Sequence, residues 1–224
     1  MRCHVAFTPD EVLEAPVAVV VDVMRATSTI AQALASGYQR VYCCREVEDA
    51  LALREKLGEG LLGGERNAVQ IEGFDLGASP REVLEPRGET LIYSTTNGTR
   101  AVLGAAAACR EVLLGSLLNL NALAGAVRED CVIVCAGFQG RFALDDAYCA
   151  GRIVELLGPT EVTDAAKVAG ILARSFPSAH EALLARTYGP PGLEEDLEFC
   201  AQENVVDVVP RLSRMVDASA EITL

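Results

Sequence analysis

The chain has 224 residues, half of them hydrophobic, and a formal net charge of −13 at pH 7. Its length suffices for one large domain or two small ones with a substantial core, and no stretch of about 18 uncharged apolar residues is present, so we expect no transmembrane helix. The negative charge disfavours a nucleic-acid or anionic-membrane partner, because the field of the protein repels polyanions, although arginines clustered in a cleft can still bind an anionic metabolite.

Strand-like and helix-like segments alternate along most of the chain. The continuous apolar run 15–23 is typical of a strand buried on both faces, and 27–36 is predicted as a helix because hydroxyl residues open it and Gly37 closes it. Further strands are expected at 41–44, 61–62, 90–94, 112–115 and 131–136. Further helices are expected at 46–57, 99–109, 119–127 and 144–157. The alternation predicts a layered α/β/α fold with a mostly parallel or mixed sheet.

The sequence becomes more helical after Gly158. Helices are expected at about 161–175, 178–187 and 191–203, and late strands at 205–209 and 220–224. We interpret 1–224 as a single domain with an α/β core over 1–160 and a mainly helical part over 161–224. Segments 19–44 and 91–116 share an order of strand, arginine-bearing turn, Ala-rich helix and strand. An internal duplication and the general likeness of βαβ units explain this echo equally well.

The eight cysteines lie in strand-like or helix-like runs, where cysteine acts as a small buried hydrophobe. No CxxC pair is present and there are only two histidines, so neither disulfides nor a structural zinc site are predicted. The first residues, MRCHVAFTPDE, lack the apolar segment of a signal peptide, so we expect a cytoplasmic protein.

Four polar loops, each bearing an arginine, are the most informative feature of the sequence. They read VDVMRATST, GGERN, STTNGTR and GFQGRFALDD, and each follows a predicted strand. Loops at the carboxyl ends of strands lie where open α/β sheets bind ligands. If the four converge, their arginines serve several anions and their carboxylates serve a hard cation. That combination indicates phosphoryl chemistry on a small, highly charged molecule.

In the first loop, Asp22 ends a strand, and Arg25 and Thr27 stand where a helix begins. A helix N-terminus with an arginine favours an anion, and Asp22 can hold a metal or act as nucleophile or base. The alternative is local: Asp22 pairs with Arg25 while Thr27 caps the helix.

In STTNGTR, Gly98 permits close backbone approach. Arg100 falls in a first helical turn, where a cation opposes the helix dipole, so it is expected to serve an anion. The alternative is a polar turn with an exposed arginine.

The remaining carboxylates are candidate metal ligands. Glu65 and Asp75 supply hard oxygen atoms suited to Mg²⁺, although a solvated loop with an internal ion pair explains them as well. Of Asp145 and Asp146, one is expected to cap the following helix and the other to bind a metal or an arginine.

Taken in order, these motifs resemble the 2-phosphosulfolactate phosphatase family. The matching strings are VVVDVMRAT (19–27), GGERN (63–67), GFDLGASP (73–80), STTNGTRA (94–101), GSLLN (115–119) and CAGFQGRFALDDAYCAG (135–151). The resemblance implies an α/β, Mg²⁺-dependent acid phosphatase that converts 2-phosphosulfolactate to 3-sulfolactate and phosphate, a step in coenzyme M biosynthesis. Such a substrate carries phosphate, sulfonate and carboxylate groups, which would occupy several arginines by charge-assisted hydrogen bonds.

On this basis the site is expected to contain three sets of residues. The catalytic candidates are Asp22, Arg25, Glu65, Arg100 and Arg141. The substrate-binding candidates are Thr27, Arg66, Thr95, Thr96, Asn97, Gly98 and Thr99. The metal-binding candidates are Asp22, Glu65, Asp75, Asp145 and Asp146. The expected partner is a small polyanionic phosphorylated substrate, with a homo-oligomer left open. A phosphatase for another phospho-hydroxy acid and a non-catalytic binder of an anionic metabolite are the alternatives.

Overall fold

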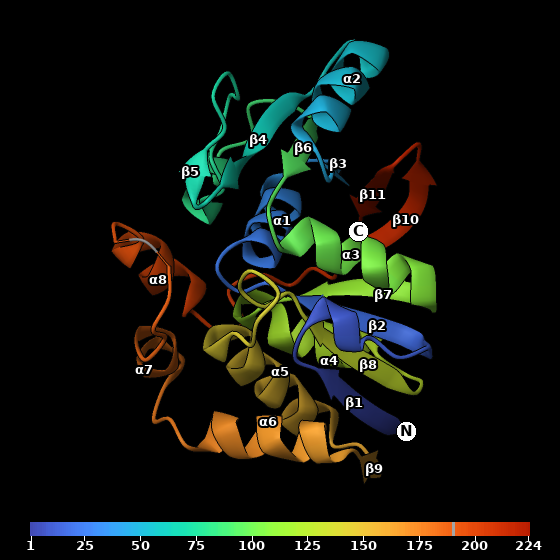
Figure 1. Ribbon diagram of the computed structural model, residues 1–224, viewed down its shortest axis with the longest axis vertical. Coiled ribbons are helices and arrows are strands. Elements are labelled where there is room, and N and C mark those ends of the chain that lie inside the picture. Colours follow the sequence, from blue (N-terminus) through green and yellow to red (C-terminus); the bar gives the residue numbers. More distant parts are fainter. Residues whose placement is uncertain (190) are drawn as a thin grey trace.

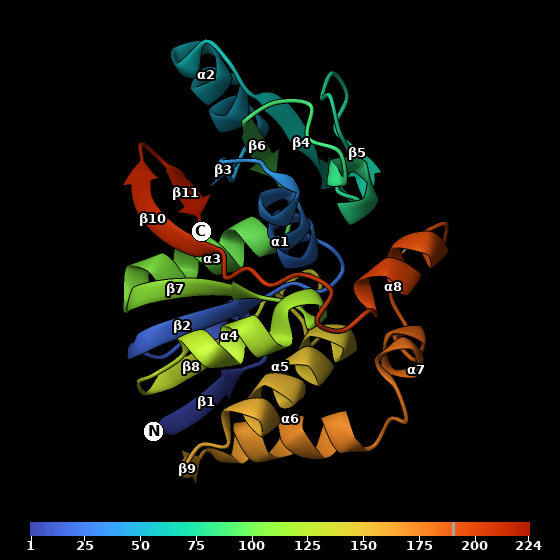
Figure 2. The same ribbon diagram turned by 180° about the vertical axis from the view of Figure 1, so that it is seen from behind.

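A single mixed sheet organises the computed structural model, which describes residues 1–189 and 191–224 (Figures 1 and 2). The strands are β1 (Arg2–Ala6), β2 (Ala15–Val21), β3 (Arg40–Cys43), β4 (Leu61–Arg66), β5 (Val69–Gln70), β6 (Thr90–Ser94), β7 (Cys109–Gly115), β8 (Cys131–Cys135), β9 (Glu161–Val162), β10 (Arg211–Val216) and β11 (Ser219–Thr223). The helices are α1 (Ala26–Ser36), α2 (Val47–Leu57), α3 (Gly98–Ala108), α4 (Leu120–Ala126), α5 (Leu144–Leu157), α6 (Asp164–Arg174), α7 (Ala179–Leu184) and α8 (Glu194–Cys200). The predicted α/β class is confirmed.

The sheet consists of two parallel halves joined by an antiparallel hairpin. Its strand order is β5-β4-β6-β3-β11-β10-β7-β2-β8-β1-β9. Strands β4, β6 and β3 run parallel in one half, and β7, β2, β8, β1 and β9 run parallel in the other. The hairpin β10–β11 pairs antiparallel with β7 on one side and with β3 on the other. The last residues of the chain therefore complete the middle of the sheet (Figure 1).

Three details of the sequence prediction differ from the structure. The strand expected at 205–209 is absent from the described residues, and the chain there runs along a short 3₁₀ helix, Leu117–Asn119, with Val206 N donating to Leu118 O at 3.1 Å. Strand β10 was not expected, because half of its residues are charged or polar and it lies largely exposed. Cys109 begins β7 instead of lying in a helix.

Alternation along the strands divides the core into layers. In β2, Val17, Val19 and Val21 pack with residues of α4 and α5, whereas Ala18 and Val20 pack with residues of α1 and α3. Figure 1 shows α3 on one side of these strands, and Figure 2 shows α4 and α5 on the other. In the second half of the sheet, α2 covers the face opposite α1. Burial on both faces explains why the central strands are continuous apolar runs.

The chain crosses between the two halves twice, and this brings two helix N-termini together. It passes from β2 through α1 to β3, and returns from β6 through α3 to β7. Both crossover helices pack on the same face of the sheet. A Cβ atom placed on Gly98, the first residue of α3, would lie 2.4 Å from the Cβ atom of Ala26, the first residue of α1. These two units are the segments that share a sequence order, and their origin by duplication stays a prediction.

The C-terminal helices pack on the face of the sheet that α4 and α5 cover. Buried residues of α6, α7 and α8 belong to the same apolar cluster as Val19 and Val21. All eight cysteines are free in the structure. Among the described helices, none is long and apolar enough to cross a membrane.

Candidate active site

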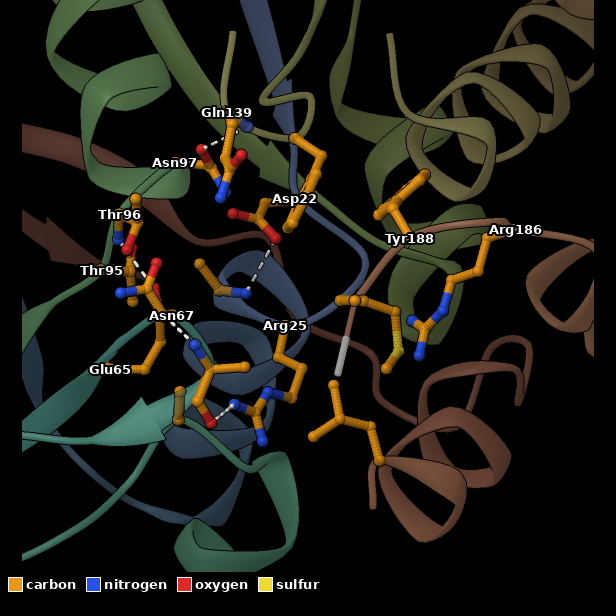
Figure 3. Close-up of a pocket in the computed structure, with 17 residues that line it drawn as sticks. Asp22, Arg25, Glu65, Asn67, Thr95, Thr96, Asn97, Gln139, Arg186 and Tyr188 are labelled. Carbon is orange, nitrogen blue, oxygen red and sulfur yellow. Dashed lines mark hydrogen bonds between the residues drawn. The ribbon is translucent and has the colours of Figure 1, made fainter. Parts of the chain in front are cut away.

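A polar pocket of about 290 Å³ opens at the carboxyl ends of β2, β6 and β8 (Figure 3). Its walls come from the loops 22–26, 95–97 and 138–139, from the turn 65–68 between β4 and β5, and from the α7–α8 connection. The four loops singled out in the sequence therefore converge, and a fifth segment from the C-terminal part joins them. The volume is at the low end for ligand pockets, which suits a small metabolite.

Asp22 lies at the centre of this pocket, only 7% exposed. Its Oδ1 accepts a hydrogen bond from Ala26 N at 3.2 Å, at the N-terminus of α1. Within the described residues, no protein group donates to its Oδ2. Burial raises the pKa of Asp22 to about 7, and the nearby charges of Asp145 and Glu65 add to the shift. Asp22 thus offers the pocket a carboxyl oxygen that has no protein partner.

Gly98 brings the backbone of α3 against this carboxyl. A Cβ atom at Gly98 would lie 2.6 Å from Asp22 Oδ2, closer than any side chain tolerates. The first turn of α3 is closed by Thr95, whose Oγ1 accepts from Thr99 N at 3.2 Å. The N-termini of α1 and α3 therefore both lie at the pocket, and each carries partial positive charge. A phosphate or another anion is favoured at this position.

Glu65 fixes two of the pocket loops to one another. Its Oε1 accepts from Thr96 N at 2.8 Å, and its Oε2 accepts from Ala68 N at 2.7 Å. Asn67 and Ala68 form the turn between β4 and β5 with φ of 54° and 63°. Such positive values suit tight hairpin turns but are unfavourable for alanine. The carboxylate of Glu65 stabilises this turn at the pocket wall.

Arg25 carries positive charge into the pocket but is largely paired with the protein. Its side chain is 9% exposed, and Nη1 donates to Asp196 Oδ2 of α8 at 2.6 Å. Its Nη2 donates to Ala68 O at 3.2 Å. Asp196 also accepts from Ser79 Oγ at 2.5 Å. Arg25 therefore ties α8 and the β4–β5 turn to the loop that follows β2.

Arg186 and Tyr188, in the α7–α8 connection, are pocket residues that the sequence analysis missed. The side chain of Arg186 is 11% exposed, with Nη1 3.9 Å from Asp145 Oδ2. The hydroxyl of Tyr188 donates to Asp145 Oδ1, and its ring stacks on Phe138 with centroids 4.8 Å apart. The string ARTYG combines arginine, a hydroxyl and glycine as the other loops do. This segment follows a helix and not a strand, so the rule that ligands bind at the carboxyl ends of strands does not indicate it.

Asp145 and Asp146 lie behind the pocket wall. Asp145 accepts from Tyr188 as well as from Asp146 N at 3.0 Å. Asp146 accepts from Val23 N and Gly137 N, both at 2.9 Å, and so joins the ends of β2 and β8. Burial raises the pKa of both carboxyls. The expectation that one of them caps α5 is wrong, since the capping position is Ala143 and no side chain caps it.

Asn97 and Thr95 line the pocket, and two other predicted residues close the loops from behind. Asn97 Oδ1 accepts from Gln139 N at 3.2 Å, which joins the loops after β6 and β8. Thr27 is buried, with Oγ1 donating to Asp22 O and accepting from Asp22 N, both at 2.9 Å. Thr99 Oγ1 accepts from Thr95 N at 3.3 Å. The hydroxyls of Thr27 and Thr99 stabilise backbone turns and do not line the pocket.

The other three arginines of the motif loops do not line the pocket. Arg66 follows Glu65 in a strand and points the opposite way, where it donates to Arg45 O and Ser94 Oγ, both at 2.9 Å. Arg100 pairs with Asp10 at 2.5 Å, and Arg141 is exposed. The catalytic roles expected for Arg100 and Arg141 and the binding role of Arg66 stay predictions that this geometry does not support.

Asp75 is also placed away from the pocket. Its Oδ2 accepts from Leu62 N at 2.8 Å and lies 3.8 Å from Arg54. Among the described residues, no three histidine, cysteine, aspartate or glutamate side chains are grouped as metal ligands. The described wall also carries no histidine, cysteine or lysine, which leaves carboxylates and the hydroxyls of threonine and Tyr188 as the side-chain nucleophiles within it.

The fold and this pocket define an α/β enzyme whose site is built for a small anionic molecule. A family model described as 2-phosphosulpholactate phosphatase matches residues 5–215. A protein of Carboxydothermus hydrogenoformans named "Probable 2-phosphosulfolactate phosphatase" is 39% identical over 94% of this chain and 92% of its own length. Proteins of the same name from Thermus thermophilus (41% identical, 95% and 94% covered) and Clostridium acetobutylicum (38% identical, 94% and 97% covered) are similar to the chain throughout.

The chain belongs to the 2-phosphosulpholactate phosphatase family and is a phosphoric monoester hydrolase. The resemblance noted in the sequence motifs is thereby confirmed, and the match extends beyond residue 160 over the C-terminal part, whose α7–α8 connection completes the pocket.

Proposed function

We propose that the protein is a cytoplasmic, Mg²⁺-dependent phosphatase that hydrolyses 2-phosphosulfolactate to 3-sulfolactate and phosphate, the reaction required in coenzyme M biosynthesis. The observation that carries the proposal is the position of Asp22 at the point where the N-termini of α1 and α3 meet, with an oxygen to which no group of the described residues donates. The substrate named for the relatives supplies the chemical identity.

The phosphoryl group is assigned to the part of the pocket beside Asp22, near these two N-termini. The helix dipoles favour a dianion there. The absence of a side chain at Gly98 allows Asp22 and Ala26 to approach the backbone of α3. Thr95 and Thr96 line the same wall and offer hydroxyl donors. The chain thus contributes fixed positive potential where the transferred group carries its charge.

The donor set of the pocket fits Mg²⁺. The ion is typically held by one or two carboxylates, with waters and substrate phosphate completing its coordination. The pocket wall offers two carboxylates, Asp22 and Glu65, and the amide oxygens of Asn67 and Asn97. Asp22 and Glu65 would hold the ion, while Asp145 and Asp146 would act behind them. Bound Mg²⁺ would neutralise the phosphoryl oxygens and polarise the phosphorus atom.

Hydrolysis of the ester requires a nucleophile at phosphorus, cleavage of the P–O bond to the substrate, and a proton for the leaving alkoxide. Asp22 is a candidate for two roles. Its carboxylate could attack the phosphorus atom directly, or it could orient a water molecule that attacks. Trapping labelled phosphate on the wild-type protein distinguishes the two, because only direct attack forms an aspartyl phosphate. Loss of the label in Asp22→Asn would assign it to this residue.

The proposal is tested by phosphate release from 2-phosphosulfolactate with Mg²⁺ and with EDTA. We expect release that EDTA abolishes and that Asp22→Asn removes. Arg110→Gln is the control, because Arg110 is exposed and pairs with Glu129 away from the pocket. Activity undiminished by EDTA would contradict the role of Mg²⁺, and no activity at all would contradict the assigned reaction.

A second candidate is a phosphatase for another small phospho-hydroxy acid. It is favoured by the arginines of the pocket, since a guanidinium accepts a carboxylate as readily as a sulfonate. Equal kcat/KM for substrates with and without the sulfonate would support it. A non-catalytic anion binder is disfavoured, because Asp22 and Glu65 would weaken simple anion affinity.

A further inference from the structure

We infer that Arg186 is the specificity-determining residue of the site, and that it binds one of the two acid groups that the substrate carries besides the phosphate, the sulfonate or the carboxylate. This inference rests on the proposed function, and it assigns the recognition role to the C-terminal connection between α7 and α8 instead of to the arginines of the motif loops.

The two pocket arginines differ in whether their guanidinium groups are already hydrogen-bonded to the protein. Arg25 donates to Asp196 and to a backbone carbonyl, so its guanidinium is engaged before any ligand binds. Arg186 is nearly as buried, yet its closest acid is Asp145 Oδ2 at 3.9 Å, beyond hydrogen-bond distance. In the described part of the chain, no hydrogen bond engages its guanidinium. A guanidinium carries several N–H donors, and Arg186 presents its donors to the pocket that it lines. An anionic ligand in the pocket would satisfy them.

The position of Arg186 suits the sulfonate or the carboxylate of the substrate and not the phosphate. Figure 3 shows Arg186 and Tyr188 on one side of the pocket and Glu65, Thr95 and Thr96 on the other, with Asp22 between them. A phosphoryl group held by Asp22 and the helix N-termini leaves the rest of the substrate to extend across the pocket. Arg186 is the cation on that side, and its fork geometry suits a carboxylate or a sulfonate.

Asp145 holds this connection in place. It accepts the hydroxyl of Tyr188 and faces Arg186, while Phe138 packs on the ring of Tyr188. Tyr188, two residues after Arg186, is therefore anchored before the substrate arrives, and holding this segment at the pocket lowers the entropy cost of binding. Asp145 is a positioning residue that acts through Arg186 and Tyr188.

The test compares wild type and Arg186→Gln on four phosphate esters. These are 2-phosphosulfolactate, 2-phospholactate without the sulfonate, isethionate phosphate without the carboxylate, and ethyl phosphate with neither group. We expect kcat/KM for 2-phosphosulfolactate to fall about 10- to 100-fold, mostly through KM, while ethyl phosphate is unaffected. The intermediate substrate that also loses rate identifies the group that Arg186 binds. Arg186→Lys is expected to restore part of the loss, and Arg110→Gln is the matched control.

An equal loss on all four esters would overturn the inference, because Arg186 would then act on the phosphate or on the fold. No loss on any ester would overturn it as well. Melting temperatures of both variants monitor folding. If wild type hydrolyses none of the esters, the proposed function fails, and binding of 3-sulfolactate and of inorganic phosphate by calorimetry tests Arg186 separately. Selective loss of 3-sulfolactate binding in Arg186→Gln supports the inference. Equal affinity of both proteins for 3-sulfolactate, or none in either, overturns it.

Discussion

Asp22 and Gly98 lie where the two crossover connections begin, the first through α1 and the second through α3. They approach so closely that a Cβ atom at Gly98 would lie 2.6 Å from the carboxyl oxygen Oδ2 of Asp22. This contact brings the N-terminus of α3 against the acid that ends β2. The pocket therefore depends on Gly98, a position that tolerates no side chain.

Gly98→Ala is expected to abolish most activity and to destabilise the protein by about 1–3 kcal/mol, because the new methyl group clashes with Asp22 and with Ala26. The control is Gly104→Ala in the same helix, where no atom lies within 4 Å of an added Cβ. That change should stabilise the protein by about 0.5–1 kcal/mol, since alanine is the better helix former. Urea unfolding and phosphate release measure both effects. Comparable behaviour of the two variants would contradict the close approach.

Asp22→Asn is expected to abolish activity and to stabilise the metal-free protein at neutral pH. The pKa of Asp22 rises from 3.8 to about 7 on folding because of burial. The folded state therefore binds this proton more tightly than the unfolded state, and the stability of wild type falls as pH rises from about 4 to about 7. Asparagine has no such proton, so the variant should gain relative to wild type across this interval, by on the order of 4 kcal/mol. Unfolding in EDTA at several pH values measures the difference. Parallel pH profiles would show that Asp22 keeps its ordinary pKa.

Glu65→Gln is expected to raise the Mg²⁺ concentration for half-maximal activity by about tenfold or more. The amide removes a charge from the proposed ion site. Its NH₂ group also faces one of the two backbone N–H groups that donate to Glu65, and two donors cannot form a hydrogen bond with each other. Asp75→Asn is the comparison, because Asp75 lies outside the pocket beside Arg54. A Mg²⁺ titration in which Asp75→Asn had the larger effect would reassign the ligand set.

Asp196→Ala is expected to cost about 3–5 kcal/mol of stability, because it leaves the buried guanidinium of Arg25 without its charged partner. The adjacent pair of Arg81 and Glu195 is exposed, with side chains 44% and 75% accessible. Glu195→Gln should therefore cost at most about 1 kcal/mol. Denaturation midpoints compare the two. A small effect of Asp196→Ala would mean that Arg25 does not depend on α8.

Much of the site could be predicted from local patterns. The bounds of β6 and α5 and the convergence of the four loops followed from apolar runs and from the shared edge at which parallel strands end. The roles of their arginines did not follow. Glu65 and Arg66 are neighbours in a strand and so point in opposite directions, and the sequence does not show which of the two faces the ligand.

The sequence also did not show that Arg186 belongs to the pocket. It lies in a segment without a preceding strand, and only the packing of α7 and α8 against the core brings it to the pocket. The order of apolar and polar residues along this chain was enough to specify most of its elements and its loops, because those depend on interactions between near neighbours. The membership of the pocket was decided by the tertiary structure, because it depends on side-chain direction and on contacts between segments distant in sequence.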